Sequence, residues 1–422
     1  MNHYCTLFDS HYLSRGLAMY ESLVETGESF TLYVFCFDES SYRIITQLKL
    51  DHLVAISLQQ FETEALLNVK GERNVAEYCW TCTPFVIGHV LMHFDVREVT
   101  YIDADLLFFH KPSILLEEFR ASGSSVLINR HKYMAEYDQS HISGIYCVEF
   151  VTFKADQNGM SVLEWWQERC LEWCYARVED GKFGDQKYLD HWPEQFEGVH
   201  VLQHIGTAAP WNVQRYHLTD DMKIDGQDLV FYHYHGFKYT GPNQFNVSTI
   251  YRISMQVITH IYAPYIEALQ KQEQRLQAYA NDAVIRHHYD TVEMAARYNR
   301  YYLMQDQWLK NVHRQRYIQQ YLQERGIQKI AIYGAGKFGE NVYAELQHSN
   351  IQVVCFIDNA NAYGDINGVP KVSPAQQELL QNVDAIIITP FYDAINIFMD
   401  HFKQKEQEHK VLSLEDIVFA LS

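Results

Sequence analysis

The chain has 422 residues, a length that corresponds to two or three domains of ordinary size. Hydrophobic residues make up 47% of it and charged residues 21%, which is typical of a globular protein with a buried core and excludes intrinsic disorder as its main state. Lys and Arg number 34 against 53 Asp and Glu, so the net charge of −19 argues against nucleic acid as a partner and against a polybasic contact with anionic lipid.

The start of the chain and its cysteines indicate a compartment. The sequence begins without the basic and apolar regions of a secretory signal, and it contains no run of about 18 apolar residues that would form a transmembrane segment. Eight cysteines are too few for a disulfide scaffold. Cys79 and Cys82 form a C-x-x-C pair, which only Cys170 and Cys174 could complete into a zinc set; aromatic residues surround both pairs, so buried thiols are favoured. These features predict a cytoplasmic protein, with peripheral attachment to the inner membrane as the alternative.

The first part of the chain alternates between predicted strands and helices. Residues 4–8 form a short apolar run that predicts a buried strand, and apolar residues then recur at helical spacing from Leu13 to Val24. Further strands are predicted over residues 30–37, 53–58, 99–102, 125–128 and 146–153. Strands that alternate with helices predict an α/β fold with a largely parallel sheet.

The pattern changes twice further along. Residues 246–325 have helical spacing with Pro264 as a breaker, which predicts a helical connector. Strand patterns restart at Lys329 and recur over residues 353–357 and 385–388. The predicted organisation is therefore an α/β domain over 1–245, a helical connector over 246–325 and a smaller α/β domain over 326–422.

Two carboxylates interrupt an otherwise apolar run at Asp103 and Asp105. Unpaired charge is costly to bury, so their place at the end of a predicted strand points to a function. Residues i and i+2 of an extended segment point to one side, which lets both carboxylates bind one hard cation such as Mg²⁺ or Mn²⁺, and these cations suit a diphosphate. The alternative is a strand end followed by a solvated turn.

Together with Thr6, Asp9 and Tyr12 at the first strand, Asp103-x-Asp105 resembles the GT-A glycosyltransferases related to family GT8. The resemblance extends over residues 3–245, and the matching blocks together resemble those of bacterial sugar transferases of surface-polysaccharide gene clusters. The other matching blocks are Thr81-Cys82-Thr83-Pro84, Glu164-Trp165-Trp166, Glu172-Trp173-Cys174-Tyr175, the stretch from Gly181 to Asp190, Ala209-Pro210-Trp211-Asn212 and His233-Tyr234-His235-Gly236-Phe237-Lys238.

The resemblance implies a metal-dependent retaining transferase of the hexosyltransferase type. It implies that the donor is a nucleotide-diphospho-sugar, in the first place a UDP-sugar, and that the acceptor is a glycan, a lipid-linked molecule or a protein, with homo-oligomers as a further expectation. Thr6, Asp9 and Tyr12 would contact the base and ribose, and Asp103 and Asp105 would bind the metal. The metal neutralises the leaving nucleoside diphosphate.

A histidine near the end of the domain would complete the metal site. His233 and His235 face the same side if their stretch is a strand, and His233 fits the family's H-x-x-G spacing to Gly236. His233 is therefore preferred, with His235 as the alternative. Lys238 resembles the lysine that reaches the diphosphate, although the usual Pro-Trp after it is replaced; a solvated lysine is the other interpretation.

The expected catalytic residues are Asp185, Gln186 and Glu149. Asp185 and Gln186 stand where the family has its sugar-facing pair, although Asp185 could also cap a helix that starts near Gln186. Glu149 replaces a glycine of the relatives, and strand alternation places Cys147, Glu149, Val151 and Phe153 on one face. Glu149 is expected to face the donor sugar; the alternative is pairing with a nearby Arg or Lys.

The last domain opens with a glycine motif, Gly334, Gly336 and Gly339, between a predicted strand and a helix, and Asp358 ends the next strand. This context resembles a Rossmann-like nucleotide site, in which glycines let backbone approach a phosphate and the acid binds a ribose. A second bound nucleotide and a purely structural role are both open. The rival functions for the chain are a non-catalytic nucleotide-sugar-binding or scaffold protein and an NAD(P)-dependent oxidoreductase centred on this motif.

Overall fold

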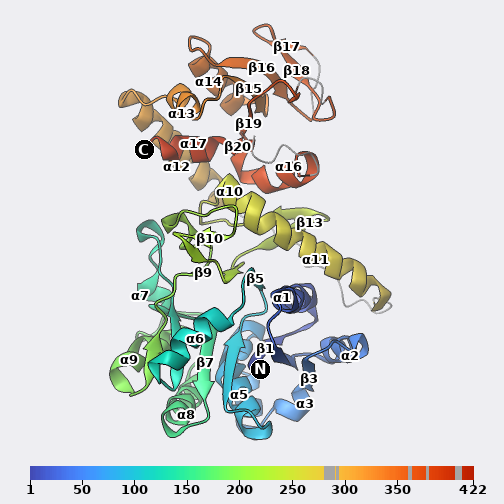
Figure 1. Cartoon of the computed structure of the whole chain (residues 1–422), viewed down its shortest axis with the longest axis vertical. Helices are drawn as coiled ribbons and strands as arrows, with labels where there is room; N and C mark the ends of the chain where they lie inside the picture. The colour runs from blue at the N-terminus through green and yellow to red at the C-terminus, as the bar shows by residue number, and fades with distance from the viewer. Residues whose placement is uncertain (280–289, 291–293, 360–363, 377–379, 404–410) are drawn as a thin grey trace. The chain divides into compact units, whose positions relative to one another are not determined.

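The computed structural model describes residues 1–279, 290, 294–359, 364–376, 380–403 and 411–422. These residues form two compact units (Figure 1). The N-terminal unit holds residues 1–235 and 265–279, and the C-terminal unit holds residues 236–264 and the described residues from 290 onward. Residues of the expected connector are thus divided between the two units.

The N-terminal unit contains a mixed seven-stranded sheet in the order β3-β2-β1-β4-β7-β6-β8. Its strands are β1 (Asn2–Phe8), β2 (Phe30–Cys36), β3 (Leu53–Ser57), β4 (Glu98–Ile102), β6 (Val126–Arg130), β7 (Tyr146–Lys154) and β8 (Val199–Val201). Neighbouring strands are parallel except that β7 runs antiparallel to both β4 and β6. The α/β fold predicted from the alternating pattern is confirmed.

Helices cover both faces of this sheet. The helices of the unit are α1 (Leu13–Glu25), α2 (Glu39–Leu48), α3 (Leu58–Phe61), α4 (Glu64–Lys70), α5 (Val75–His93), α6 (Ser113–Ser122), α7 (Ser140–Ser143), α8 (Gln157–Glu172), α9 (Trp192–Gln195) and most of α11 (Ala263–Leu276). Alternate residues of β1 enter different cores. Cys5 and Leu7 pack with α5 and α8, whereas Tyr4 and Phe8 pack with α1 and α6.

A small three-stranded sheet lies beyond the end of β4 and carries part of the candidate site. Its order is β5 (Leu106–Phe108), β12 (Phe231–His233) and β9 (Thr207–Ala208), and β5 and β12 are antiparallel. The hairpin of β10 (Lys223–Ile224) and β11 (Gln227–Asp228) precedes β12 in the chain. Antiparallel pairing therefore brings residues more than 120 positions apart next to the acidic motif.

The C-terminal unit is a second α/β structure. Its elements are β13 (Lys238–Gly241), β14 (Gln244–Asn246), α10 (Met255–Val257), α12 (Met294–His313), α13 (Ile318–Glu324), β15 (Lys329–Tyr333), α14 (Lys337–Leu346), β16 (Gln352–Ile357), β17 (Asp365–Ile366), β18 (Val369–Val372), β19 (Ala385–Ile388), α16 (Ala394–His401), β20 (Val411–Ser413) and α17 (Leu414–Ala420). The strands of the sheet have the order β17-β18-β16-β15-β19-β20, and all are parallel except β17. The chain adds β16 and β18 on one side of β15 and then β19 and β20 on the other, as in doubly wound folds.

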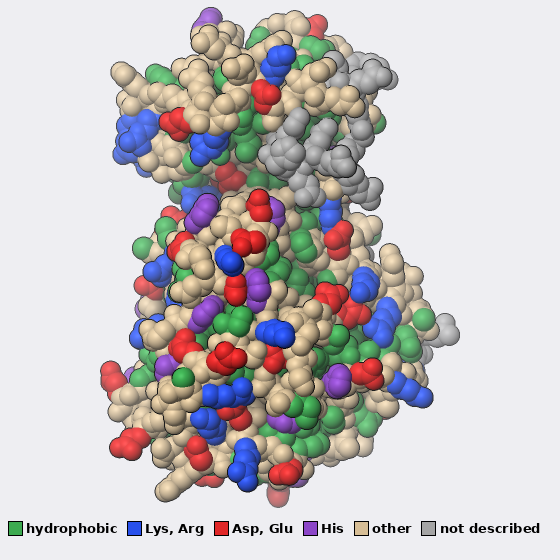
Figure 2. Space-filling view, viewed as in Figure 1, with side chains coloured by type: hydrophobic (Ala, Val, Ile, Leu, Met, Phe, Trp, Pro, Cys, Tyr) green, Lys and Arg blue, Asp and Glu red, His purple; other side chains and the backbone are tan. Residues whose placement is uncertain are grey.

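The surface mixes charges of both signs. On the face drawn in Figure 2, Lys and Arg side chains lie interspersed with Asp and Glu rather than gathered over one element. Within the described ranges, no helix is both long enough and apolar enough to cross a bilayer.

Candidate functional site

Asp103 and Asp105 lie directly after the carboxyl end of β4. The Asp103 amide donates to the Glu149 carbonyl oxygen on β7 (3.2 Å), and the Tyr101 hydroxyl donates to Asp103 Oδ1 (3.0 Å). The two aspartate side chains keep 29% and 19% of their surface exposed. The backbone is thus fixed by the sheet while both carboxylates remain accessible.

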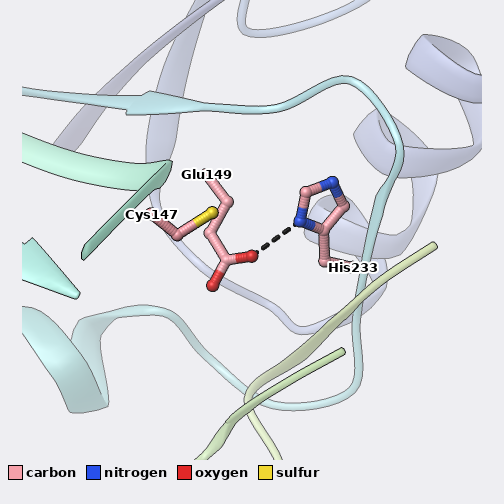
Figure 3. A group of neighbouring side chains, drawn as sticks. All are labelled: Cys147, Glu149 and His233. Carbon is pink, nitrogen blue, oxygen red and sulfur yellow. Dashed lines mark hydrogen bonds and ion pairs between the residues drawn. The ribbon is translucent and has the colours of Figure 1, made fainter. Parts of the chain in front are cut away.

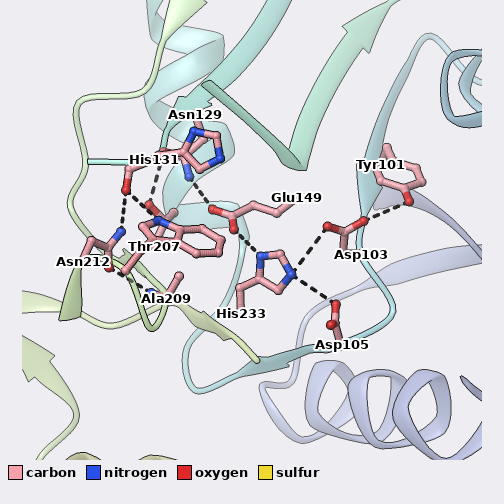
Figure 4. A network of polar contacts seen from close by, with 11 residues as sticks. Tyr101, Asp103, Asp105, Asn129, His131, Glu149, Thr207, Ala209, Asn212 and His233 are labelled. Carbon is pink, nitrogen blue, oxygen red and sulfur yellow. Dashed lines mark hydrogen bonds and ion pairs between the residues drawn. The ribbon is translucent and has the colours of Figure 1, made fainter. Parts of the chain in front are cut away.

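The small sheet brings His233 to these aspartates (Figure 4). His233 is paired with Leu106 across β12 and β5, and the Tyr234 amide donates to the Asp105 carbonyl oxygen (3.0 Å). His233 Nε2 lies 3.2 Å from Asp105 Oδ1 and 3.8 Å from Asp103 Oδ2. One ligand atom from each of the three residues lies within 4.8 Å of the others, a spacing at which they could hold one metal ion.

The other ring nitrogen of His233 contacts Glu149. Glu149 Oε2 lies 2.6 Å from His233 Nδ1, and Glu149 Oε1 accepts a hydrogen bond from Asn129 Nδ2 (2.8 Å). Glu149 is only 2% exposed. Glu149 was expected to face the donor sugar, and its position differs from that expectation. Its side chain contacts the Nδ1 side of His233, whereas the two aspartates face Nε2, and each of its carboxylate oxygens already has a partner. Nor is its direct partner an Arg or Lys.

A backbone irregularity explains this position. The β6–β7 register shifts between Leu127 and Asn129, so the alternation expected along β7 is interrupted. Tyr146, Val148, Val151 and Phe153 consequently enter one core cluster, whereas the alternation predicted Val151 and Phe153 on the opposite face from Tyr146 and Val148. That alternation was wrong because it assumed a regular strand.

Cys147, Glu149 and His233 form a second cluster of potential ligands (Figure 3). All three are buried, and both Glu149 oxygens already have partners. Oxygen ligands suit Mg²⁺ and Mn²⁺ better than a thiol does. The more exposed pair of aspartates with His233 is therefore the better site for a hard cation.

Electrostatic interactions within the site are strong. Burial lowers the pKa of His233, but the charge of Asp105 and hydrogen bonds to Asp105, Cys147 and Glu149 outweigh it and raise this pKa well above its usual value. Burial raises the pKa of Asp105, but the charge of His233 outweighs it and lowers this pKa to about 2. Burial raises the pKa of Asp103 to about 6, although His233 opposes the shift. In the absence of a cation, His233 provides the positive charge that compensates the aspartates.

Asp185 is a buried carboxylate near this site. Burial, followed by the negative charge of Asp103, raises its pKa to about 7. Trp166 Nε1 donates to the Asp185 carbonyl oxygen (2.9 Å) and fixes the backbone there. Asp185 stands at the N-cap of the 3-10 helix Gln186–His191, where its side chain makes no capping hydrogen bond. Hydrogen bonds from Thr83 and from the Gln186 backbone oppose the rise in its pKa. Gln186 is half-buried.

Thr6, Asp9 and Tyr12, which were expected to contact the nucleoside, differ in how exposed they are. Thr6 is fully buried within β1. Asp9 Oδ1 accepts a hydrogen bond from the His11 amide (3.0 Å) and caps the 3-10 helix Ser10–Tyr12. Partial desolvation of its ring, and then the charge of Asp105, raise the pKa of Tyr12, although the side chain is 41% exposed. Tyr12 is the most exposed of the three side chains.

His235 and Lys238 are not part of the cluster of potential ligands. β12 ends at His233, so the alternation expected to align the two histidines does not extend to His235, which is exposed and packs edge-on to Trp211 (5.5 Å between ring centres). Trp211 also packs edge-on to His233 (5.3 Å). Lys238 belongs to the C-terminal unit, where its amine lies 3.7 Å from Asp290.

The glycine motif of the C-terminal unit joins β15 to α14. Gly334 has a φ of +97°, and a Cβ on Gly339 would lie 2.0 Å from the Gly334 carbonyl oxygen. A Cβ on Gly336 would meet nothing within 4 Å. Asp358 Oδ2 accepts a hydrogen bond from the Ala335 amide (3.2 Å). The backbone conformation at Gly334 and the close backbone approach at Gly339 thus require glycine, whereas a side chain at Gly336 would meet open space.

Sequence reasoning missed the residues that support Glu149. Asn129 Oδ1 accepts from Thr207 Oγ1 (3.2 Å), and Lys132 Nζ lies 3.5 Å from Asn129 Oδ1. Lys132 Nζ also donates to the His204 carbonyl oxygen (2.8 Å), and burial lowers the pKa of Lys132 to about 8. The available signal was Asn129 itself, an amide that ends the apolar run of a central strand.

These features define an α/β protein with an acidic and histidine-containing site at the end of a central strand. The chain is 31% identical to YfnD of Bacillus subtilis (strain 168) over 286 residues, which cover 65% of this chain and 91% of YfnD. It is 32% identical to YfnF of the same organism over 287 residues, which cover 65% of this chain and 93% of YfnF. The chain belongs to the family of these two proteins, both described as uncharacterized.

Other similarities are partial. A family model described as C2185-like, N-terminal, matches residues 326–408. Similar solved structures include mouse xyloside xylosyltransferase 1 (15% identity, 55% of this chain and 97% of that one, TM-score 0.38) and the galactosyltransferase LgtC (12%, 64% and 95%, 0.40). The glycosyltransferase GlyE of Streptococcus pneumoniae is a third (11%, 92% and 84%, 0.40).

Proposed function

We propose that this protein is a metal-dependent glycosyltransferase that uses a nucleotide-diphospho-sugar. The observation that supports the proposal most strongly is the convergence of Asp103, Asp105 and His233 Nε2 on one accessible point at the end of β4. Two carboxylates and one imidazole fit a hard divalent cation such as Mn²⁺ or Mg²⁺. Such a cation, when bound, stabilises the negative charge that develops on a leaving diphosphate.

The remaining residues would bind and orient the donor. Transfer breaks the bond between the anomeric carbon and a diphosphate oxygen and forms a bond from that carbon to an acceptor oxygen, which loses its proton. Ionised Asp185 would stabilise positive charge on the sugar as the bond breaks, and Gln186 would bind a sugar hydroxyl. Tyr12 would contact the nucleoside. A retaining outcome, a UDP-sugar donor and a role in surface-polysaccharide assembly are the finer parts of this proposal, and they follow from the resemblance of the motifs.

The test is release of nucleoside diphosphate from a panel of nucleotide sugars, with Mn²⁺ or with a chelator. We expect at least one donor to be hydrolysed slowly, only with the metal, and Asp103→Asn or Asp105→Asn to abolish this turnover because an amide binds the cation poorly. Asp51→Asn, an exposed position in the same unit, is the matched control. Full turnover with the chelator would contradict metal dependence, and no hydrolysis of any donor would favour a non-catalytic binding protein.

A further inference from the structure

We infer that Glu149 is a positioning residue that holds His233 in the tautomer whose Nε2 can bind a divalent cation. The inference rests on the proposed function, because it concerns the same cation site. It assigns to Glu149 a role that differs from contact with the donor sugar. The chain of contacts runs from Asn129 through Glu149 and His233 to the two aspartates (Figure 4).

The neighbours of Asn129 fix the direction of its hydrogen bonds. Lys132 Nζ can only donate, and it lies 3.5 Å from Asn129 Oδ1, which also accepts from Thr207 Oγ1. The oxygen of the Asn129 amide must therefore face these two groups. Its nitrogen faces Glu149 Oε1, to which it donates at 2.8 Å.

The contact with Glu149 fixes the proton on His233 Nδ1. An ionised carboxylate can only accept, so the 2.6 Å contact to Glu149 Oε2 requires the hydrogen to lie on His233 Nδ1. When a cation replaces the proton on Nε2, the ring keeps its hydrogen on Nδ1 and presents its lone pair on Nε2, the atom that faces Asp103 and Asp105. A carboxylate that accepts from the second nitrogen of a metal-binding histidine fixes the ring and increases its basicity.

Burial shields the contacts of Glu149 from water. Glu149 is 2% exposed, so water has little access to replace either of its hydrogen bonds. Each oxygen already has one partner, so Glu149 serves better as a support for His233 than as a third ligand together with Cys147.

The decisive variant is the isosteric change Glu149→Gln. Asn129 presents a donor, so the introduced amide will turn its oxygen toward Asn129 and its NH₂ group toward His233 Nδ1. That nitrogen must then accept, which moves the ring proton to Nε2 and blocks the ligand position. We expect Mn²⁺ affinity, measured by electron paramagnetic resonance of free Mn²⁺ in a titration, to fall by about 10- to 100-fold.

A second change is designed to restore binding. In Asn129→Asp combined with Glu149→Gln, the introduced carboxylate only accepts, so the amide will turn its NH₂ group toward position 129 and its oxygen toward His233. The proton then returns to Nδ1, and Mn²⁺ affinity should recover to within a few-fold of wild type. Glu149→Asp, which keeps a group that only accepts, should bind Mn²⁺ better than Glu149→Gln. This variant keeps the comparison usable if one of the amide variants does not fold.

The outcomes separate this inference from the proposed function. If wild type binds Mn²⁺ and His233→Ala does not, but a folded Glu149→Gln binds as tightly as wild type, the positioning role is overturned and the cation site stands. If Cys147→Ala weakens binding as much as Glu149→Gln does, the buried cluster is the cation site and the positioning role is again overturned. If wild type binds no Mn²⁺, the cation site itself is overturned, and the inference with it.

Discussion

Asp185 shows how one residue links stability to chemistry. Its pKa of about 7 in the folded protein exceeds its ordinary value of 3.8, so between these pH values the folded state binds more protons than the unfolded state. The free energy of unfolding must therefore fall as pH rises through this window. Each unit of pKa difference corresponds to about 1.4 kcal/mol, so ionisation of Asp185 lowers the free energy of unfolding above pH 7 by on the order of 4 kcal/mol.

Asp185→Asn removes this ionisation. With a chelator present, we expect the variant to gain stability relative to wild type as pH rises from about 4 to 7, because its amide stays neutral. Chemical denaturation at several pH values checks this. In the hydrolysis assay, the same variant should lose turnover far more than nucleotide affinity, because the charge acts mainly in the transition state. Normal turnover together with an unchanged pH profile would show that Asp185 is neither buried as described nor directed at the sugar.

The residues also show where sequence reasoning reaches its limit. Asp103 and Asp105 were identifiable because charge inside an apolar run is costly and therefore informative. The hydrogen bond from Asn129 to Glu149 could not be identified from the sequence, because it depends on a register shift between two strands that no local pattern reveals. His233 could be preferred because it fits the H-x-x-G spacing of the family that the chain resembles, but the separation of His233 from His235 required knowing where β12 ends.

At the scale of elements, the β15–α14 turn depends on close backbone approach. A Cβ at Gly339 would lie 2.0 Å from the Gly334 carbonyl oxygen, whereas the same atom at Gly336 would meet open space. We expect Gly339→Ala to lower the stability of the C-terminal unit by about 1–3 kcal/mol, the usual cost of overpacking, and Gly336→Ala to leave it nearly unchanged. Thermal melting of both variants beside wild type measures the difference.

Variants of this glycine motif also test whether it binds a nucleotide or is purely structural. If a nucleotide binds there, as Asp358 at the end of β16 and the space beside Gly336 allow, a larger change such as Gly336→Val should weaken nucleotide binding without altering melting. Equal melting of Gly339→Ala and wild type would instead show that the turn relaxes easily and that the close approach is not required.

At the scale of the whole molecule, the predicted boundaries and the compact units differ. The sequence placed a boundary near residue 325 because the strand pattern restarts there, and local pattern could not show that residues 236–264 pack with the last part of the chain. Asn396 accepts from the Phe245 amide (2.9 Å) and donates to its carbonyl oxygen (3.0 Å), and Asp416 accepts from the Met255 amide (2.7 Å). Contacts between residues so far apart in the sequence cannot be predicted from the local spacing of residue types.

These contacts predict the effect of truncation. A chain that ends at Arg325 lacks Asn396 and Asp416 and leaves the buried polar groups of Phe245 without their partners, at a cost of about 1–3 kcal/mol for each group. We expect this truncated chain to melt earlier or aggregate, and Asn396→Ala in the full chain to show a smaller loss in the same direction. A truncated chain that stays monomeric and melts like the full protein would contradict the division into these two units.

The central claim is that Asp103, Asp105 and His233 bind one divalent cation. The most direct measurement is anomalous diffraction from crystals soaked in Mn²⁺. We expect an anomalous peak between the two aspartate carboxylates and His233 Nε2, and no such peak in Asp105→Asn crystals soaked in the same way. A peak beside Cys147 and Glu149, or wild-type crystals without a peak at the aspartates, would contradict it.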